Sequence, residues 1–122
     1  MFEEAADGLT GEEALMAMGR AYNARLDNPE ILQLQLQKWS AACQDEEVRE
    51  VSRRGLSEIW MLVERLSGAD DQRVTVFIAS GMLLNVFAAL GLPRIKEQLG
   101  EALTGMAPAV RRATNGRSAR AE

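Results

Sequence analysis

An uncharged stretch near the C-terminal end constrains the fold more than any other feature, because no Asp, Glu, Lys or Arg occurs from Val74 to Leu92. Asp70 or Asp71 can cap the start of a helix here, and a Gly-Leu-Pro sequence can end it. We therefore expect one long helix from Asp71 to Leu90. Such a helix is too apolar to be covered by one protomer of a small bundle, so it implies a dimer.

The same stretch is long enough to be a candidate membrane span. Arg73 and Arg94 flank it symmetrically without an orientation signal, and no Trp or Tyr lies near either end. Its hydrophobicity is lowered by five small or polar residues, Thr75, Ser80, Gly81, Asn85 and Gly91. A buried helix of a soluble protein is the favoured interpretation, and we expect no membrane partner.

Helical spacing separates two faces of this helix, of which one can pack inward while the other meets a symmetry mate. The segment 45–67 carries a second wide apolar stripe, so two helices from each protomer would form an intermolecular four-helix bundle. The alternative is a well-buried central helix in a monomer. The residues expected at the dimer interface are Leu56, Val63, Phe77, Ile78, Gly81, Leu84, Asn85 and Ala88.

Asn85 is the strongly polar side chain in this apolar run. It can fix the register of a dimer by pairing with its symmetry mate, or it can bond to a backbone carbonyl of its own helix. The sequence leaves both alternatives open.

Capping signals place the earlier helices. Thr10 and Glu13 form a capping box ahead of a helix from about Gly11 to Leu26. The first eight residues resemble the final turns of another helix, closed by Gly8, so we expect a further portion upstream.

Asn28 and Pro29 start the next helix, because Asn caps free N–H groups and Pro at the first helical position gives up no hydrogen bond. The alternating Leu and Gln residues of 32–37 also fit a strand. A helix is favoured because an apolar face continues over more than ten residues and no partner strand is present. That face consists of Leu32, Leu36, Trp39 and Cys43.

Asp45 and two glutamates open a third helix, where negative charge meets the positive end of the helix dipole, and Gly68 closes it. Gly55 in the middle costs about 1 kcal/mol relative to Ala, so we expect another helix to approach it closely.

These signals together predict an all-α fold, a bundle of about five helices forming one domain over residues 1–104. The stripe of Ile95, Leu99 and Leu103 allows a short closing helix. Residues 105–122 contain Gly, Pro and several Arg, and we expect a disordered basic tail there.

Composition excludes several functions. The net charge of −4 and the pI near 5.0 argue against nucleic-acid binding by this chain. The chain has no histidine and a single cysteine, which excludes Ser-His and Cys-His catalysis and the usual zinc sites. Adjacent acidic pairs at the helix starts are explained by capping. We expect no enzyme activity, no metal, no cofactor and a cytoplasmic location.

A second candidate site is a small-molecule pocket between the early helices and the dimer pair. Thioethers, flat aromatic rings and a few hydrogen-bonding groups are the usual composition of a site for an apolar or amphipathic ligand. Ordinary core filling is the alternative. The expected ligand-binding residues are Met18, Tyr22, Gln35, Leu36, Trp39, Cys43 and Trp60, with Met16 close by.

From Phe2 to Leu92 the sequence resembles the C-terminal half of TetR-type transcriptional regulators. The resemblance rests on overall pattern, and none of its motifs is a catalytic signature. The matching segments are Phe2–Ala6, Leu34–Gln37 ahead of Trp39, Asp45–Arg49, Ser67–Ala69, and Phe77–Ala88 with its Gly81–Val86 core.

The resemblance implies a division of labour between an N-terminal helix-turn-helix head and later helices that hold an inducer pocket and a dimeric four-helix bundle. Nothing before Thr10 is long or basic enough to be a recognition helix, so we do not expect this chain alone to bind DNA. The expected function is that of the effector-sensing and dimerising part of a repressor. The alternative is a standalone helical interaction protein that binds no ligand.

Overall fold

The computed structural model describes residues 1–94 of the chain. Over this range it contains five helices and no strand, which confirms the predicted all-α bundle. The expected closing helix at 95–103 and the basic tail at 105–122 lie outside the described residues. The helices are α1 (Phe2–Ala5), α2 (Gly11–Arg25), α3 (Pro29–Ala42), α4 (Glu46–Ser67) and α5 (Asp71–Ala89).

Three of the helices begin where a side chain caps them. The Asn28 side chain accepts a hydrogen bond from the Glu30 N–H at 3.0 Å, so the segment that alternates Leu and Gln is a helix, as predicted. Asp45 caps α4 by accepting from two backbone N–H groups. Asp70, not Asp71, caps α5 and accepts from the Arg73 N–H at 2.9 Å.

The capping box predicted at Thr10 is wrong, although the position of the helix start is right. Thr10 occupies the N-cap position of α2, but its side chain makes no capping hydrogen bond. Gly68 ends α4 as predicted, with φ of +67°, a left-handed conformation that costs glycine little.

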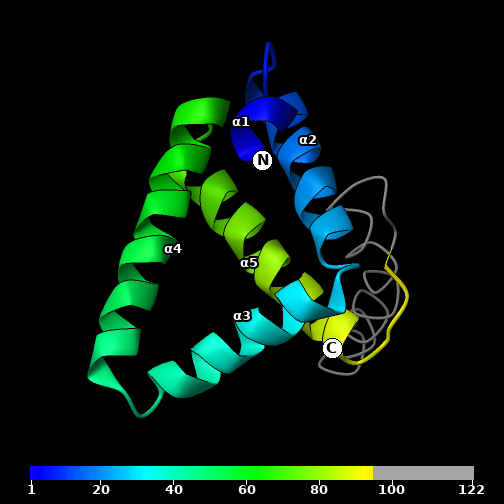
Figure 1. Cartoon of the computed structure of the whole chain (residues 1–122). Helices are drawn as coiled ribbons and strands as arrows, with labels where there is room; N and C mark the ends of the chain where they lie inside the picture. Colours follow the sequence, from blue (N-terminus) through cyan, green and yellow to red (C-terminus); the bar gives the residue numbers. More distant parts are fainter. Residues whose placement is uncertain (95–122) are drawn as a thin grey trace, which may run out of the picture.

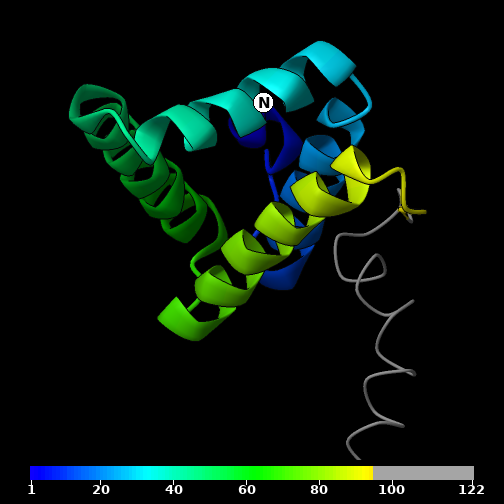
Figure 2. The same ribbon diagram turned by 90° about the horizontal axis from the view of Figure 1, so that it is seen from below.

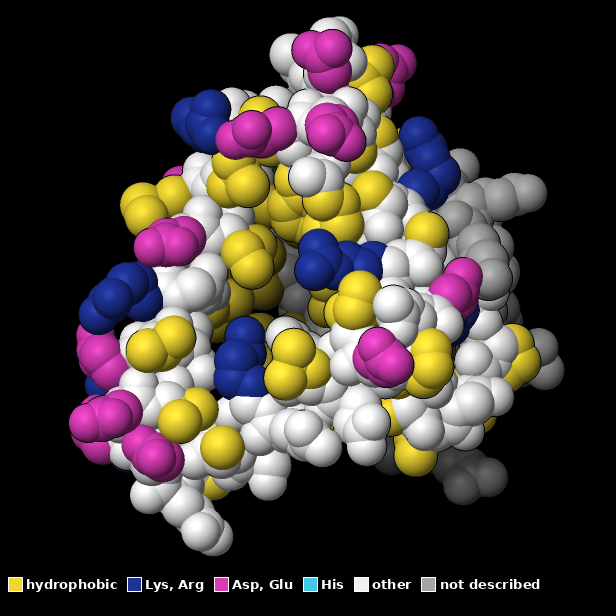
Figure 3. Space-filling view, in the orientation of Figure 1, with side chains coloured by type: hydrophobic (Ala, Val, Ile, Leu, Met, Phe, Trp, Pro, Cys, Tyr) yellow, Lys and Arg dark blue, Asp and Glu magenta, His cyan; other side chains and the backbone are white. Residues whose placement is uncertain are grey.

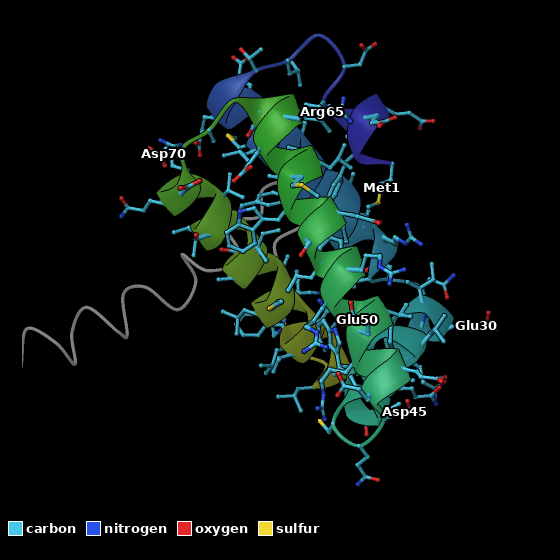
Figure 4. The ribbon with its side chains drawn as sticks, turned by 90° about the vertical axis from the view of Figure 1, so that its left-hand side faces the viewer. Met1, Glu30, Asp45, Glu50, Arg65 and Asp70 are labelled. Carbon is cyan, nitrogen blue, oxygen red and sulfur yellow. The ribbon has the colours of Figure 1, made fainter. Side chains whose placement is uncertain are left out.

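The helices enclose an open triangle (Figures 1 and 2). α4 and α5 meet at the turn between Ser67 and Asp71 and then diverge, and α3 bridges the gap between their far ends. α2 lies along α5 on the other side of that helix. Figure 4 shows the two ends of α4: Arg65 lies near α1, where it pairs with Glu3 at 3.4 Å, and Asp45 lies at the opposite end.

The core gathers at one end of this triangle. α3 contributes no buried residue, and α4 contributes only Val63 and Ser67 from its last two turns. The buried apolar cluster therefore joins α1, α2, α5 and the end of α4. Its members are Phe2, Ala6, Ala14, Leu15, Met18, Leu26, Val63, Val74, Phe77 and Leu84.

Two glycines behave differently from expectation. A Cβ added at Gly55 would meet nothing within 4 Å, so the predicted close approach of another helix does not occur within the described chain. At Gly81, which the sequence placed at a dimer seam, the Tyr22 ring of α2 lies 3.5 Å from the position of a Cβ. Gly81 is therefore a contact point inside the protomer.

Candidate functional site

A recess lies at the middle of the triangle formed by α3, α4 and α5, and the space-filling view shows hydrophobic side chains around it and Lys or Arg side chains at its mouth (Figure 3). α3 turns one face toward its neighbours, yet every residue on that face is only half-buried. On α4, the apolar side chains of Leu56 and Ile59 stay 40% and 44% exposed. The half-buried face of α3 consists of Ile31, Leu32, Gln35, Leu36, Trp39 and Ala42.

Tyr22 of α2 and Asn85 of α5 form a polar pair where these two helices pack against each other. The Asn85 Nδ2 donates to the Tyr22 hydroxyl oxygen at 2.5 Å and to the Gly81 carbonyl oxygen at 2.9 Å. Asn85 is fully buried, whereas Tyr22 is half-buried and packs against the apolar core. Of the two alternatives for Asn85, the bond to a carbonyl of its own helix is the one observed.

Burial raises the pKa of the Tyr22 hydroxyl above its ordinary value of 10.0, against smaller opposing effects of the Asn85 hydrogen bond and the Arg25 charge. The tyrosine is therefore neutral at physiological pH, and its hydroxyl keeps a proton to donate.

The predicted ligand-binding residues are only partly brought together. Gln35, Leu36 and Trp39 share the half-buried face of α3, on the side of the recess. Met18 does not belong to that set, because it is fully buried in the core and a ligand could reach it only by repacking. Cys43 is exposed at the end of α3, where its Sγ lies 3.5 Å from the Trp39 carbonyl oxygen.

Trp60 of α4 is half-buried and packs against the core cluster. Its indole Nε1 donates to the Glu64 carboxylate at 3.2 Å, one turn along the same helix. The polar edge of this indole is thus already satisfied, and only its ring face is available to a ligand.

A separate groove of about 330 Å³ lies between the first halves of α2 and α5. An ion pair joins Glu12 and Arg73 beside it. None of the seven predicted ligand-binding residues lines it, although the neighbouring Met16 does. The groove exists because α2 and α5 run side by side, which no local sequence signal reveals. Its lining is Glu12, Leu15, Met16, Gln72, Arg73, Val76, Phe77 and Ser80.

The predicted dimer face needs correction. Val63, Phe77, Leu84 and Asn85 are buried inside the protomer and cannot present their side chains to a second copy. Ile78, Gly81 and Ala88 are half-buried on the same inner side, and only Leu56 is exposed. The physical reason is that both faces of α5 are apolar, so the sequence alone could not distinguish the inner face from the outer one.

The outer face of α5 is instead the uncovered one. Val76 is 57% exposed, Val86 45% and Leu90 69%. With Ala79 and the half-buried Leu83, these residues repeat at alternating steps of three and four, so they form one continuous stripe. We call these five residues the outer stripe. α5 is also the described helix that is long and apolar enough to cross a membrane by length and composition.

Arg94 forms a contact that the sequence did not suggest, because it was interpreted only as a charge flanking the apolar run. Its guanidinium donates to the Asn23 carbonyl oxygen at 2.9 Å, to the Asn23 Oδ1 at 2.8 Å and to the Asp27 Oδ1 at 2.6 Å. A cation at the C-terminal end of α2 is favourable to the helix dipole. This contact fastens the chain after α5 to the corner between α2 and α3.

No family model matches this chain, and no curated protein or solved structure matches it. These comparisons therefore give no support to the expected resemblance to TetR-type regulators. Among residues 1–94 there is also no cluster of Asp, Glu and Cys that could hold a metal ion.

Proposed function

We propose that this chain is the effector-sensing and dimerisation domain of a TetR-like transcriptional regulator. Dimerisation uses the outer stripe of α5, and an apolar or amphipathic effector enters the recess between α3, α4 and α5. In the whole regulator, ligand binding shifts the first helices and changes the spacing of two DNA-binding heads on their half-sites. The observation that carries the proposal is the exposure of the outer stripe.

The outer stripe supports dimerisation because it is continuous and free of charge. Singly scattered exposed apolar residues are normal on a monomer, but a stripe along a whole helix is a typical contact surface. A two-fold axis would place the stripes of two copies against each other, so that each apolar residue is covered by the same face of its partner. This pairing replaces the interface first expected from the sequence.

The dimer is tested by Val86→Glu, with Ser57→Glu as the matched control on the exposed polar side of α4. Two-fold symmetry introduces the Val86→Glu charge twice, so we expect dimer dissociation to become about thirtyfold easier or more. Sedimentation equilibrium at micromolar concentration measures this change. A monomeric wild-type chain, or equal effects of the two variants, would contradict the proposed interface.

The effector site is supported by the half-buried faces around the recess, which leave apolar area uncovered within the protomer. A thermal-shift screen of lipophilic compounds tests it, because a ligand that binds the folded state raises the melting temperature. The contrary result is a chain that dimerises but is not stabilised by any compound of a broad panel. That result would contradict the effector site and favour the alternative function, a helical dimerisation protein that binds no ligand.

Two further experiments separate this function from others. Gel-shift binding of DNA by this chain alone would contradict the assignment of DNA contacts to a separate head. Because α5 has the composition of a membrane span, the second experiment is fractionation without detergent. We expect the chain in the supernatant, whereas recovery in the membrane fraction would place the outer stripe against lipid.

A further inference from the structure

The groove between the first halves of α2 and α5 opens beside the outer stripe. Val76 belongs to both surfaces, because it lines the groove and is 57% exposed in the stripe. Glu12 and Arg73, whose ion pair borders the groove, are each more than half exposed, whereas Leu15 and Phe77 form its buried inner wall. The groove is therefore open to solvent on the face of α5 that the proposed dimer uses.

This groove has room for a bulky apolar side chain. Its volume is about 330 Å³, whereas a cavity of roughly 150 Å³ already holds a benzene molecule. At the other end of the outer stripe, Leu90 is 69% exposed, the largest exposed fraction among the large apolar side chains of residues 1–94. One end of the stripe thus offers an open apolar groove, and the other end offers an uncovered leucine.

The spacing of the outer stripe matches these two ends to each other across a two-fold axis. Val76 lies seven residues before Leu83, and Leu90 lies seven residues after it. A two-fold axis at Leu83, perpendicular to α5, therefore places Leu90 of one copy opposite Val76 of the other. The same axis places the small Ala79 close to the larger Val86 of the second copy. Steps of three and four residues are typical of a seam between two helices that cross at about 20°.

Charge also favours the antiparallel pair over a parallel one. An antiparallel pair brings the C-terminal end of each α5, which is the negative end of the helix dipole, toward Arg73 of the other copy. A parallel pair would place the two Arg73 side chains at the same end. It would also place Ala79 opposite Ala79, which leaves a gap between the helices, and it would bring no leucine to either groove.

We propose that the groove between α2 and α5 receives Leu90 of a second copy of this chain, so that the two α5 helices pair antiparallel about Leu83. This inference rests on the proposed function, because it specifies how the outer stripes meet. By symmetry the dimer contains two such contacts. In each of them the leucine packs beside Val76 and Met16 and against the inner wall of the groove.

Chemical cross-linking tests the orientation. The variants are Val76→Cys and Leu90→Cys, each combined with Cys43→Ser to remove the single natural thiol. In an antiparallel dimer the two thiols of either variant alone are separated by fourteen residues of helix, about 21 Å, which a short bismaleimide cannot span. We expect a cross-linked dimer on a denaturing gel only after the two variants have been mixed and have exchanged subunits.

The contribution of the leucine is measured by Leu90→Ala, with Leu34→Ala as the matched control. Leu34 lies on α3 and is 67% exposed, nearly as much as Leu90, but it is remote from the outer stripe. Two-fold symmetry removes the Leu90 side chain twice, so the dissociation constant of the dimer should rise about a hundredfold. Leu34→Ala should change it by less than about twofold. Sedimentation equilibrium measures both constants.

The outcomes separate this inference from the function beneath it. If each cysteine variant cross-links with itself and the mixture forms no mixed product, the helices are parallel and the inference is wrong, while the dimer stands. Equal effects of Leu90→Ala and Leu34→Ala would also overturn the inference. A monomeric wild-type chain would contradict both the inference and the proposed dimerisation. Val76 and Leu90 are exposed, so their substitution leaves the core of the protomer intact.

Discussion

The two ends of the triangle differ in how they are held together, although their sequences carry similar apolar stripes. At the closed end, α1, α2, α5 and the last turns of α4 bury the apolar cluster. At the open corner, α3 and the first turns of α4 bury no side chain, and polar contacts fix their junction. There, the Arg49 guanidinium donates to the carbonyl oxygens of Ala42 and Cys43, each at 3.0 Å. An amphipathic pattern therefore shows which face of a helix is apolar, but it does not show whether the same chain covers that face.

The largest expected effect separates the two ends directly. Leu84→Ala at the closed end removes a fully buried side chain and should lower the free energy of unfolding by about 2–5 kcal/mol. Leu56→Ala at the open corner removes a side chain that is 40% exposed and should cost roughly 0.5 kcal/mol. Urea denaturation measures both changes. Equal losses would show that something covers the open corner.

Removing an N-terminal helix cap should destabilise the chain more at the open corner than at the closed end. Asp45→Ala at the open corner deletes an acceptor for the N–H groups of Glu47 and Val48 and should cost about 1 kcal/mol. Thr10→Ala at the start of α2 deletes no hydrogen bond and should cost clearly less, since the Thr10 side chain caps nothing. Urea midpoints of the two variants test this difference, and a larger loss for Thr10→Ala would overturn the observed capping.

A glycine substitution can sharpen the description of the open corner. Gly55→Ala adds a methyl group where no atom lies within 4 Å, so helix propensity should stabilise the chain by about 0.5–1 kcal/mol. Gly81→Ala at the closed end is the control, because its methyl group meets the Tyr22 ring at an ordinary contact distance. Loss of dimer on Gly55→Ala would reveal that a second copy packs against this part of α4.

The smallest expected effect is a pH dependence of the closed end. Because burial raises the pKa of Tyr22, the unfolded chain loses this proton at a lower pH than the folded chain does. The stabilising contribution of the neutral tyrosine is present below about pH 10 and is lost as the pH rises above that ordinary pKa.

The free energy of unfolding should therefore fall more steeply for the wild type than for Tyr22→Phe between about pH 9 and about pH 11. Tyr22 is the single tyrosine, so ultraviolet absorbance of tyrosinate follows it directly. A midpoint at or below the ordinary value would show that the hydroxyl is not buried.

The helices could be predicted from sequence because their signals are local. Asn28, Asp45 and Gly68 act within one turn of their own positions, and the structure confirms each of them. The position of α5 could not be predicted in the same way. What distinguishes the inner face of α5 from the outer one is its contact with α2. The contacting residues of α2 lie more than sixty positions earlier in the sequence.

In the candidate site, too, the residue types could be predicted from the sequence but the contacts between distant residues could not. Tyr22 was expected in a ligand site from its residue type, and Asn85 was recognised as an unusual polar residue. Their pairing with each other was not foreseen, since Asn85 was placed at a dimer seam. The Arg94 contact was missed for the same reason, because Asn23 carries no local signal for a partner 71 positions later.

The side-by-side packing of α2 and α5 also sets the order in which the chain can assemble. The hydrogen bond between Tyr22 and Asn85 joins positions 63 residues apart, and the Arg94 contact after α5 joins positions 71 residues apart, so the closed end cannot form before α5 has been synthesised. α3 and α4, which adjoin in sequence, can pair earlier while their apolar stripes are still uncovered. A nascent chain on the ribosome therefore exposes the apolar cluster residues of α1, α2 and the end of α4 until α5 has emerged, and this interval is when it is most prone to aggregate or to need a chaperone.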